Sequence, residues 1–216
     1  RPLENWGAQV PIEGFPGSGT LDLIPPLVSD WGRWQDRSAS YDANFGIPRE
    51  LGMVTSSSPP IVVNGVVVVL AEVADPGNAG TLVRSAEAFG ASGVIFAGGV
   101  DPYNPKCVRA TAGSLFRLPF AVLEGDGAVD EALILLEASG RHCWGSVAEG
   151  GIPPIEVPDG RPIALLLGNE PHGLAEDAIA RCEGLVTIAT TGSGDSLNVA
   201  VAGAVLLYGL QQAAGR

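Results

Sequence analysis

The sequence Ile163-Ala-Leu-Leu-Leu-Gly168 is an uninterrupted apolar run, and the glycine-bounded turn Asn169-Glu-Pro-His-Gly173 follows it directly. A second short run, Leu185-Val-Thr-Ile188, is followed by the segment Thr190–Tyr208, in which a polar loop leads into a long apolar helix pattern. Fully apolar runs of this kind are typical of strands in parallel sheets whose two faces are covered by helices. The C-terminal part of the chain therefore predicts a strand, a turn, a second strand and a helix of an α/β domain.

Polar residues stand directly after each of these two predicted strands. Glu170 follows the first strand, and Ser196 and Asn198 follow the second, at the start of the last helix. In open α/β sheets, ligands bind at the carboxyl ends of the strands. Ser196 is also a natural helix N-cap, which is a sufficient reason for a serine there. Asn198 has no evident benefit to a helix, so we expect it to serve a site.

The same alternation of strands and helices extends upstream. The β-branched run Val66–Val73, the turn Asp75–Gly80, the amphipathic pattern Thr81–Phe89 and the apolar run Val94–Ala97 form a strand–turn–helix–strand unit. Further helices are predicted at 105–113, 128–138 and 175–181, and further strands at 119–123 and 142–147. Together these patterns predict an α/β domain with a mostly parallel sheet over residues 61–216.

Residues 1–60 have a different composition. Proline and glycine recur every few residues, no apolar period of a helix or strand is sustained, and the segment ends in Ser56-Ser-Ser-Pro-Pro60. This composition predicts an irregular arm, or the remnant of a domain, followed by a linker. Because the chain begins with Arg1 rather than Met, we expect it to be processed, trimmed or a fragment.

The charge balance is strongly acidic: the chain carries a net charge of −12 and a single lysine, Lys106. Such acidity indicates solubility rather than a fold, and it argues against nonspecific nucleic-acid binding, for which a basic surface is the usual footprint. Cys107, Cys143 and Cys182 have no metal-ligand spacing, and we expect reduced thiols of a cytoplasmic protein. Neither a membrane span nor a signal peptide is indicated.

The first turn of the upstream unit holds Asn78 and Gly80, and Arg84 lies one helical turn further on. Glycines let a backbone approach a ligand, and a guanidinium binds phosphate or carboxylate, so this is a weak phosphate-site pattern. An ordinary tight turn beside a surface arginine explains the same residues. Glu170 is likewise either structural or catalytic, and the lone His172 is more typical of a loop hydrogen bond than of a base.

Three motifs, which occur in a fixed order along the chain, point to a function more specifically than any of these single residues does. The motifs are Asp75–Gly90, Leu165–Leu174 and Asp195–Ala202. Together with the intermediate stretch Asp101–Ser114, they resemble the SpoU (TrmH-like) RNA ribose 2′-O-methyltransferases of the SPOUT superfamily, over the part of the chain from Val66 to Gln212. The resemblance implies a C-terminal deep trefoil knot in the parallel sheet, a homodimer with its active site at the interface, and a reaction that needs no metal.

The resemblance also implies a role for each candidate residue. The cofactor is expected to be S-adenosylmethionine, held by backbone groups at Gly168, Ile188 and Leu197. Arg84 matches the arginine that helps to remove the proton from the ribose 2′-OH. The positions that orient the ribose, the phosphate and the motif loops correspond to Asn78, Glu170, Ser196 and Asn198. The implied substrate is ribosomal RNA, with tRNA less favoured.

Two further hypotheses stay open. Residues 1–60 are too short and too rich in proline and glycine to match the RNA-binding domain that often precedes this family's catalytic domain. Together with the acidic charge, this leaves a catalytically idle knotted dimer that binds cofactor or RNA as the main alternative. A doubly wound nucleotide-binding oxidoreductase ranks last, because the chain lacks the glycine fingerprint and the acid that bind a dinucleotide.

Overall fold

The computed structural model describes residues 65–158, 160–190 and 197–214, together with four two-residue strands nearer the N-terminus. Those strands pair antiparallel, β1 (Val10–Pro11) with β2 (Thr20–Leu21) and β3 (Tyr41–Asp42) with β4 (Ile47–Pro48). The chain divides into two compact units, Arg1–Leu51 and Gly52–Arg216. The irregular arm or remnant expected over residues 1–60 falls, apart from these strands, outside the described residues, and a boundary at residue 60 stays a prediction.

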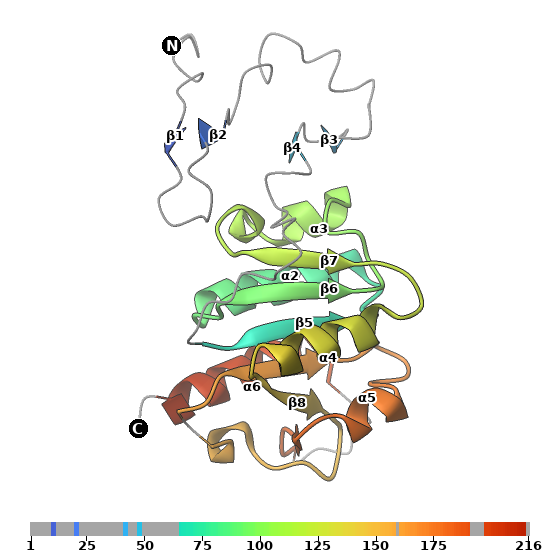
Figure 1. The fold of residues 1–216 in the computed structure, drawn as a ribbon, viewed down its shortest axis with the longest axis vertical. Coiled ribbons are helices and arrows are strands. Elements are labelled where there is room, and N and C mark those ends of the chain that lie inside the picture. Colours follow the sequence, from blue (N-terminus) through green and yellow to red (C-terminus); the bar gives the residue numbers. More distant parts are fainter. Residues whose placement is uncertain are drawn as a thin grey trace, which may run out of the picture. The chain divides into compact units, whose positions relative to one another are not determined.

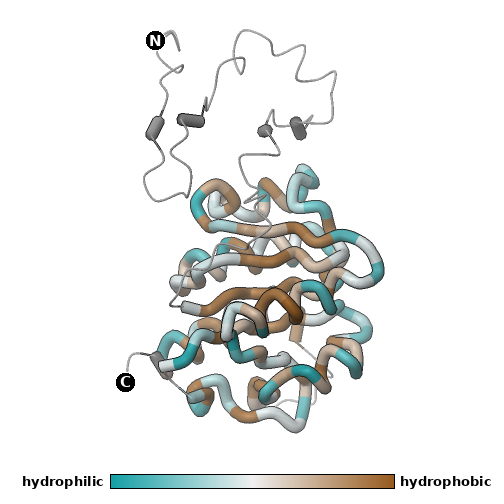
Figure 2. Tube along the Cα trace, in the orientation of Figure 1, coloured by the Kyte–Doolittle hydropathy of each residue, from teal (hydrophilic) through white to brown (hydrophobic). Residues whose placement is uncertain are grey.

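Six parallel strands form the sheet of the second unit, so the mostly parallel α/β architecture is confirmed (Figure 1). Their order across the sheet is β10-β8-β9-β5-β6-β7. The strands are β5 (Val67–Ala71), β6 (Gly93–Ala97), β7 (Phe120–Leu123), β8 (His142–Ser146), β9 (Ile163–Leu167) and β10 (Gly184–Val186). The two most apolar runs, β5 and β9, are neighbours in the middle, and Figure 2 shows apolar residues concentrated in the strands.

Helices cover both faces of this sheet. They are α2 (Pro76–Ala88), α3 (Pro105–Ala110), α4 (Ala128–Ala138), α5 (Glu176–Ala180) and α6 (Val199–Ala214), with 3-10 turns at Ser114–Phe116 and Pro154–Glu156. Alternate residues of β5, such as Val69, pack in one cluster with α4 and α5. On the other face, Gly203 of α6 lies against Leu82 of α2 and Leu167 of β9. The sheet therefore lies between an α4–α5 layer and an α2–α6 layer (Figure 1).

Helix α2 begins at Pro76, whereas the apolar pattern predicts a start at Thr81. The Asp75 carboxylate accepts a hydrogen bond from the Asn78 backbone N–H at 2.8 Å and so caps the helix. Proline at the first helical position has its φ already set for a helix. The prediction of a separate tight turn over Asp75–Gly80 is therefore wrong, because most of this stretch is the first turn of α2.

Gly80 sets the distance between α2 and α3. A Cβ atom added to Gly80 would lie 2.6 Å from the Ala110 Cβ and would overlap the Cys107 carbonyl oxygen. Any side chain at this position would push the two helices apart. The close approach fixes α3 beside the first two turns of α2, which lead away from the carboxyl end of β5.

We expect Gly80→Ala to lower the free energy of unfolding by about 1–3 kcal/mol, the usual cost of overpacking. Alanine favours a helix more than glycine does, but the steric cost is larger than that gain. Urea denaturation measures the change. Gly127→Ala is the control: its φ is −101°, and no atom lies within 4 Å of an added Cβ. The control should stay within about 0.5 kcal/mol of the wild type. Equal stabilities of the two variants would contradict the close helix contact.

Candidate active site

Glu170 joins the turn after β9 to the start of α2. Its carboxylate accepts a hydrogen bond from the Asn78 side-chain amide at 3.0 Å. It also accepts longer hydrogen bonds, each 3.4 Å, from the backbone N–H groups of Ala74 and Asp75. The acid that follows β9 is thus held by the segment that follows β5, its neighbour in the sheet. This is the arrangement expected at the carboxyl ends of adjacent parallel strands.

Asn198 brings the start of α6 into the same network. Its side-chain N–H donates to the Asn78 side-chain oxygen at 3.0 Å. Its side-chain oxygen accepts from the backbone N–H groups of Ala200 and Val201 at 2.9 and 3.2 Å. Asn198 is therefore the N-cap of α6. The expectation that Asn198 brings no benefit to the helix is wrong: one end of its amide stabilises α6, and the other holds Asn78.

The Glu170 carboxylate stays ionised at neutral pH. Burial alone would raise its pKa, but the hydrogen bonds from Asn78, from its own backbone N–H and from Ala74 and Asp75 outweigh burial and lower the pKa. The side chain is exposed, so an ionised carboxylate faces solvent beside two amide groups. An acceptor fixed in this way can orient a hydroxyl or amide donor of a ligand.

Asn169 is a site residue that the sequence patterns did not single out. Its side-chain N–H donates at 3.0 Å to the carbonyl of Glu72, whose φ of 57° is in the left-handed region. Its backbone exchanges hydrogen bonds of 3.1 and 2.8 Å with Gly173, which close the turn around Glu170. Among the described residues, the buried Asn169 Oδ1 has no hydrogen-bond partner. The sequence does show a polar residue directly before Glu170, and this position was the signal that could have identified Asn169 as part of the site.

The expected cofactor residues follow strands at the same edge of the sheet. Gly168 directly follows β9, and the half-buried Ile188 follows β10. Strand β8 lies between these two strands, so their ends are about 10 Å apart at the usual strand spacing. Leu197, 42% exposed, immediately precedes the cap of α6. A Cβ on Gly168 would overlap the backbone of Gly173, so the turn itself already requires glycine there.

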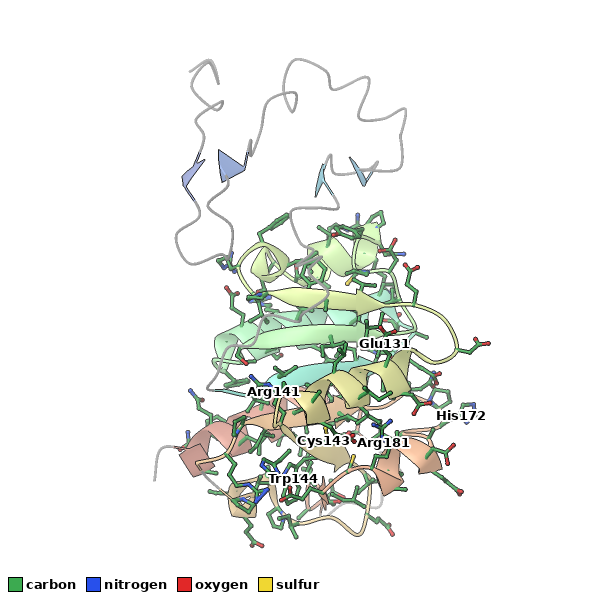
Figure 3. All side chains as sticks on the ribbon, viewed as in Figure 1. Glu131, Arg141, Cys143, Trp144, His172 and Arg181 are labelled. Atoms are coloured by element: carbon green, nitrogen blue, oxygen red, sulfur yellow. The ribbon has the colours of Figure 1, made fainter. Side chains whose placement is uncertain are left out.

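Arg84 is not part of the hydrogen-bonded network. It is exposed on α2, six residues beyond Asn78, or about 9 Å along the helix axis at 1.5 Å per residue. No described residue pairs with its guanidinium. Ser196 lies outside the described residues. His172 is exposed at the outer edge of the molecule, as expected for a loop residue (Figure 3).

Other chemistry finds little support in the described parts of the chain. Burial raises the pKa of the Cys107 and Cys143 thiols to about 12, so they remain protonated and poorly nucleophilic. Residues 65–158, 160–190 and 197–214 contain no group of three or more His, Cys, Asp or Glu residues that could hold a metal ion. None of the described helices is long and apolar enough to cross a membrane.

Comparison with known protein sequences places the site in a family. The family model described as SpoU rRNA Methylase family matches residues 65–208. The chain is 35% identical over 146 residues to the 23S rRNA (guanosine(2553)-2'-O)-methyltransferase RlmP of Bacillus subtilis, which covers 67% of this chain and 57% of that protein. It is 38% identical over 136 residues to a 23S rRNA (uridine(2479)-2'-O)-methyltransferase of Streptomyces viridochromogenes, which covers 62% and 47%. The chain thus spans about half the length of these curated relatives.

Solved structures agree with the sequence comparison. The SpoU methyltransferase AviRb of Streptomyces viridochromogenes, in complex with the cofactor AdoMet, superposes with a TM-score of 0.64 at 35% identity. The superposition covers 70% of this chain and 62% of AviRb. An RNA 2'-O ribose methyltransferase superposes with a TM-score of 0.67 at 28% identity, over 78% of this chain and 62% of the other. With a family model matched over residues 65–208 and the fold shared, the chain belongs to the SpoU rRNA Methylase family.

Proposed function

We propose that this chain is an S-adenosylmethionine-dependent RNA methyltransferase of the cytoplasm that methylates a ribose 2′-OH in ribosomal RNA, with tRNA as the less favoured substrate. Family membership and the names of the related 23S rRNA enzymes support this proposal. One observation carries it: Asn78, Glu170 and Asn198, from three separate motifs, meet in one hydrogen-bonded network. Such convergence is expected of a site that must hold a ribose in a single orientation.

The residues near the strand ends suit S-adenosylmethionine, the methyl donor of this reaction. Ile188 and Leu197 offer apolar contacts, and Gly168 leaves room for the backbone of the turn. The unpartnered Asn169 Oδ1, next to Gly168, is a buried acceptor that still lacks a donor among the described residues. We assign Gly168, Ile188 and Leu197 to cofactor binding on this basis, and we add Asn169 as a residue that shapes the same corner.

In the reaction, this chain's residues would orient the nucleophile and stabilise its charge. The ionised Glu170, the amides of Asn78 and Asn198, and Ser196 would together orient the ribose, the phosphate and the motif loops. The Arg84 guanidinium, as a cation, would stabilise the 2′-oxyanion as it forms and so assist the loss of the hydroxyl proton to solvent. Positioning of the two reactants for attack is worth on the order of 7–11 kcal/mol. No metal is needed for any of these roles.

A C-terminal trefoil knot is part of the proposal. Strand β10 lies at the edge of the sheet, yet Asn198, only twelve residues beyond Val186, contacts Asn78 of α2 beside β5. The chain therefore passes from the edge of the sheet to its middle between Val186 and Asn198. Chains rarely thread in this way, but the return path is what a knot at this end of the sheet requires.

We also propose that the active protein is a homodimer that uses α6. Val201, Val205 and Tyr208 form an apolar stripe along α6, with exposures of 51%, 42% and 53%. The spacing of these residues puts them on one face of the helix. Arg84 is exposed on α2, which packs beside α6, so a partner that covers the stripe would also approach Arg84.

Arg84→Ala tests the catalytic assignment. We expect methyl transfer to ribosomal RNA from a strain that lacks this gene to fall about 10²–10³-fold, the usual effect of removing one oxyanion donor. Cofactor affinity, measured by calorimetry, should not change. Arg181→Ala, which removes an equal charge from an arginine paired with Glu137 of α4 on the other side of the sheet, should keep full activity. Wild-type rates in Arg84→Ala would contradict this role, and cofactor binding without methylation of any RNA would favour the idle dimer.

Two substitutions of Asn198 separate its two roles. Asn198→Ala removes the cap and should lower the free energy of unfolding by about 1 kcal/mol, in addition to lowering activity. Asn198→Asp keeps a capping oxygen but loses the donor to Asn78, so stability should hold while methyl transfer falls about tenfold, or ~1.4 kcal/mol. Urea denaturation and initial rates measure the two effects. A fully active Asn198→Asp enzyme would show that the contact with Asn78 is dispensable.

Val205→Glu tests the dimer. A charge in the middle of the apolar stripe cannot be buried without a partner, so we expect the variant to be monomeric and inactive. Sedimentation equilibrium measures the mass. Ile134→Glu, at a 58% exposed position on α4, is the matched control and should leave the mass unchanged. A wild-type monomer, or a dimeric Val205→Glu protein, would rule out this interface.

A further inference from the structure

The charges of the catalytic unit are divided between its two helical layers. Helices α4 and α5 contain five acidic residues: Asp130, Glu131, Glu137, Glu176 and Asp177. Arg181, the residue after α5, pairs with Asp130 and Glu137 and offsets part of this negative charge. Helices α2 and α3 contain three basic residues and a single acid: Arg84, Lys106, Arg109 and Glu87. Figure 3 shows Glu131 on α4 in the layer in front of the sheet. The net charge of the chain therefore hides a difference between two surfaces.

Both acids that contact these helices are paired with a cation. The Arg117 guanidinium donates to both carboxylate oxygens of Glu87, at 2.7 Å for Nη2, and Lys106 pairs with Asp75, the N-cap of α2. All three basic residues of α2 and α3 are exposed. With these two pairs counted, α2 and α3 still hold two further cations, Arg84 and Arg109, in a protein whose net charge is −12. A polyanion would meet attraction here and repulsion over α4 and α5.

The three cations follow the line where α2 and α3 touch. That line passes through Gly80, which meets Cys107 and Ala110. Lys106 extends across Gly77, because a Cβ added there would lie 3.1 Å from the Lys106 Cε. On α2, Arg84 lies one turn beyond Gly80, and on α3, Arg109 lies one turn beyond Lys106. Lysine and arginine thus flank the contact line from both helices.

This line leads directly to the candidate active site. The Lys106 Nζ donates to the Asp75 carboxylate at 2.7 Å, and the Asp75 backbone N–H donates to Glu170. Asp75 also caps α2 through the backbone of Asn78. Only Asp75 therefore separates the Lys106 ammonium from the residues that we assign to the ribose. A strand of RNA along α2 and α3 would have its backbone next to these cations and one ribose at Glu170.

The Lys106–Asp75 pair is free to share its cation with a phosphate. Both side chains are well exposed, 57% for Lys106 and 42% for Asp75. Exposed ion pairs of this kind contribute little to the free energy of folding, so a phosphate that draws Lys106 away from Asp75 would cost little stability. Lys106 is also the only lysine in the chain. A purely structural role, in which Lys106 only links α3 to the start of α2, would not require Lys106 to lie beside the candidate active site.

We propose that Lys106 and Arg109, which lie beside the catalytic Arg84, form the surface that binds the phosphate backbone of the RNA next to the methylated nucleotide. The inference rests on the proposed function and identifies where its substrate lies. It explains how an acidic chain binds a polyanion: the acidic residues of α4 and α5 lie on the opposite layer and keep RNA on the α2–α3 side. Specificity for one nucleotide must then come from RNA shape and base contacts rather than from net charge.

Binding of a fluorescein-labelled single-stranded oligoribonucleotide tests this surface, with fluorescence anisotropy measured between about 50 and 200 mM salt. Each phosphate contact on a single strand contributes about 0.7 to the slope of log K against log salt concentration. Lys106→Gln and Arg109→Gln should each weaken binding at low salt and reduce that slope by about this amount. Lys106→Arg should restore both. Cofactor affinity and unfolding midpoints should match the wild type, which separates lost RNA contacts from misfolding.

Ile134→Glu on α4 is the control, because it lowers the net charge by the same single unit on the acidic layer. We expect its RNA affinity and salt slope to equal those of the wild type. Equal losses in all three variants would mean that only net charge matters and would overturn the proposal, as would unchanged binding in Lys106→Gln and Arg109→Gln or no salt-dependent binding by the wild type. Binding as expected, with no methylation of ribosomal RNA, would support this surface and overturn the proposed reaction instead.

Discussion

The hydrogen-bonded chain from Glu170 through Asn78 to Asn198 is the constraint on which the site depends. It joins segments 92 and 120 residues apart in the sequence. Each amide uses both of its ends, so the loss of one member leaves the polar groups of the others without partners. The carboxyl ends of β5 and β9 and the first turn of α6 are thereby fixed relative to one another before any ligand arrives. Preorganisation of this kind is what lets fixed dipoles stabilise a transition state.

Local sequence patterns predicted most strands and helices well, because the apolar pattern and the end residues of each element are set by residues close in the sequence. The apolar runs became β5, β6 and β9, and the helix predicted over residues 128–138 matches α4. The sequence pattern misses the start of α2 because Asp75-Pro76 also fits a turn, although an acidic cap followed by proline is equally a helix start. Asn78, Glu170 and Asn198 come from three separate motifs, and only the long-range hydrogen bonds show that their side chains meet.

Asn198 and Asn169 show where sequence reasoning stops. The helical pattern of α6 gave no reason for an amide at residue 198, because the cap was assigned to Ser196 instead. Asn169 supports the left-handed Glu72 from a distant strand, and no periodicity in either segment records that contact. The Asn198 error is local, because its oxygen caps α6 through Ala200 and Val201. Asn169 is missed because its hydrogen bond to Glu72 is tertiary and depends on the order of strands in the sheet.

Helix α6 links stability, assembly and the site through a single amide. Its first turn needs the Asn198 oxygen, and the same side chain can reach Asn78 only when the helix has formed. The stripe proposed for the dimer, from Val201 through Val205 to Tyr208, begins one turn beyond that cap. A partner that covers the stripe would therefore also lie close to the cap and to Leu197, which we assign to cofactor binding. Assembly would then complete the site by stabilising one helix end, and no separate switch is needed to couple the two.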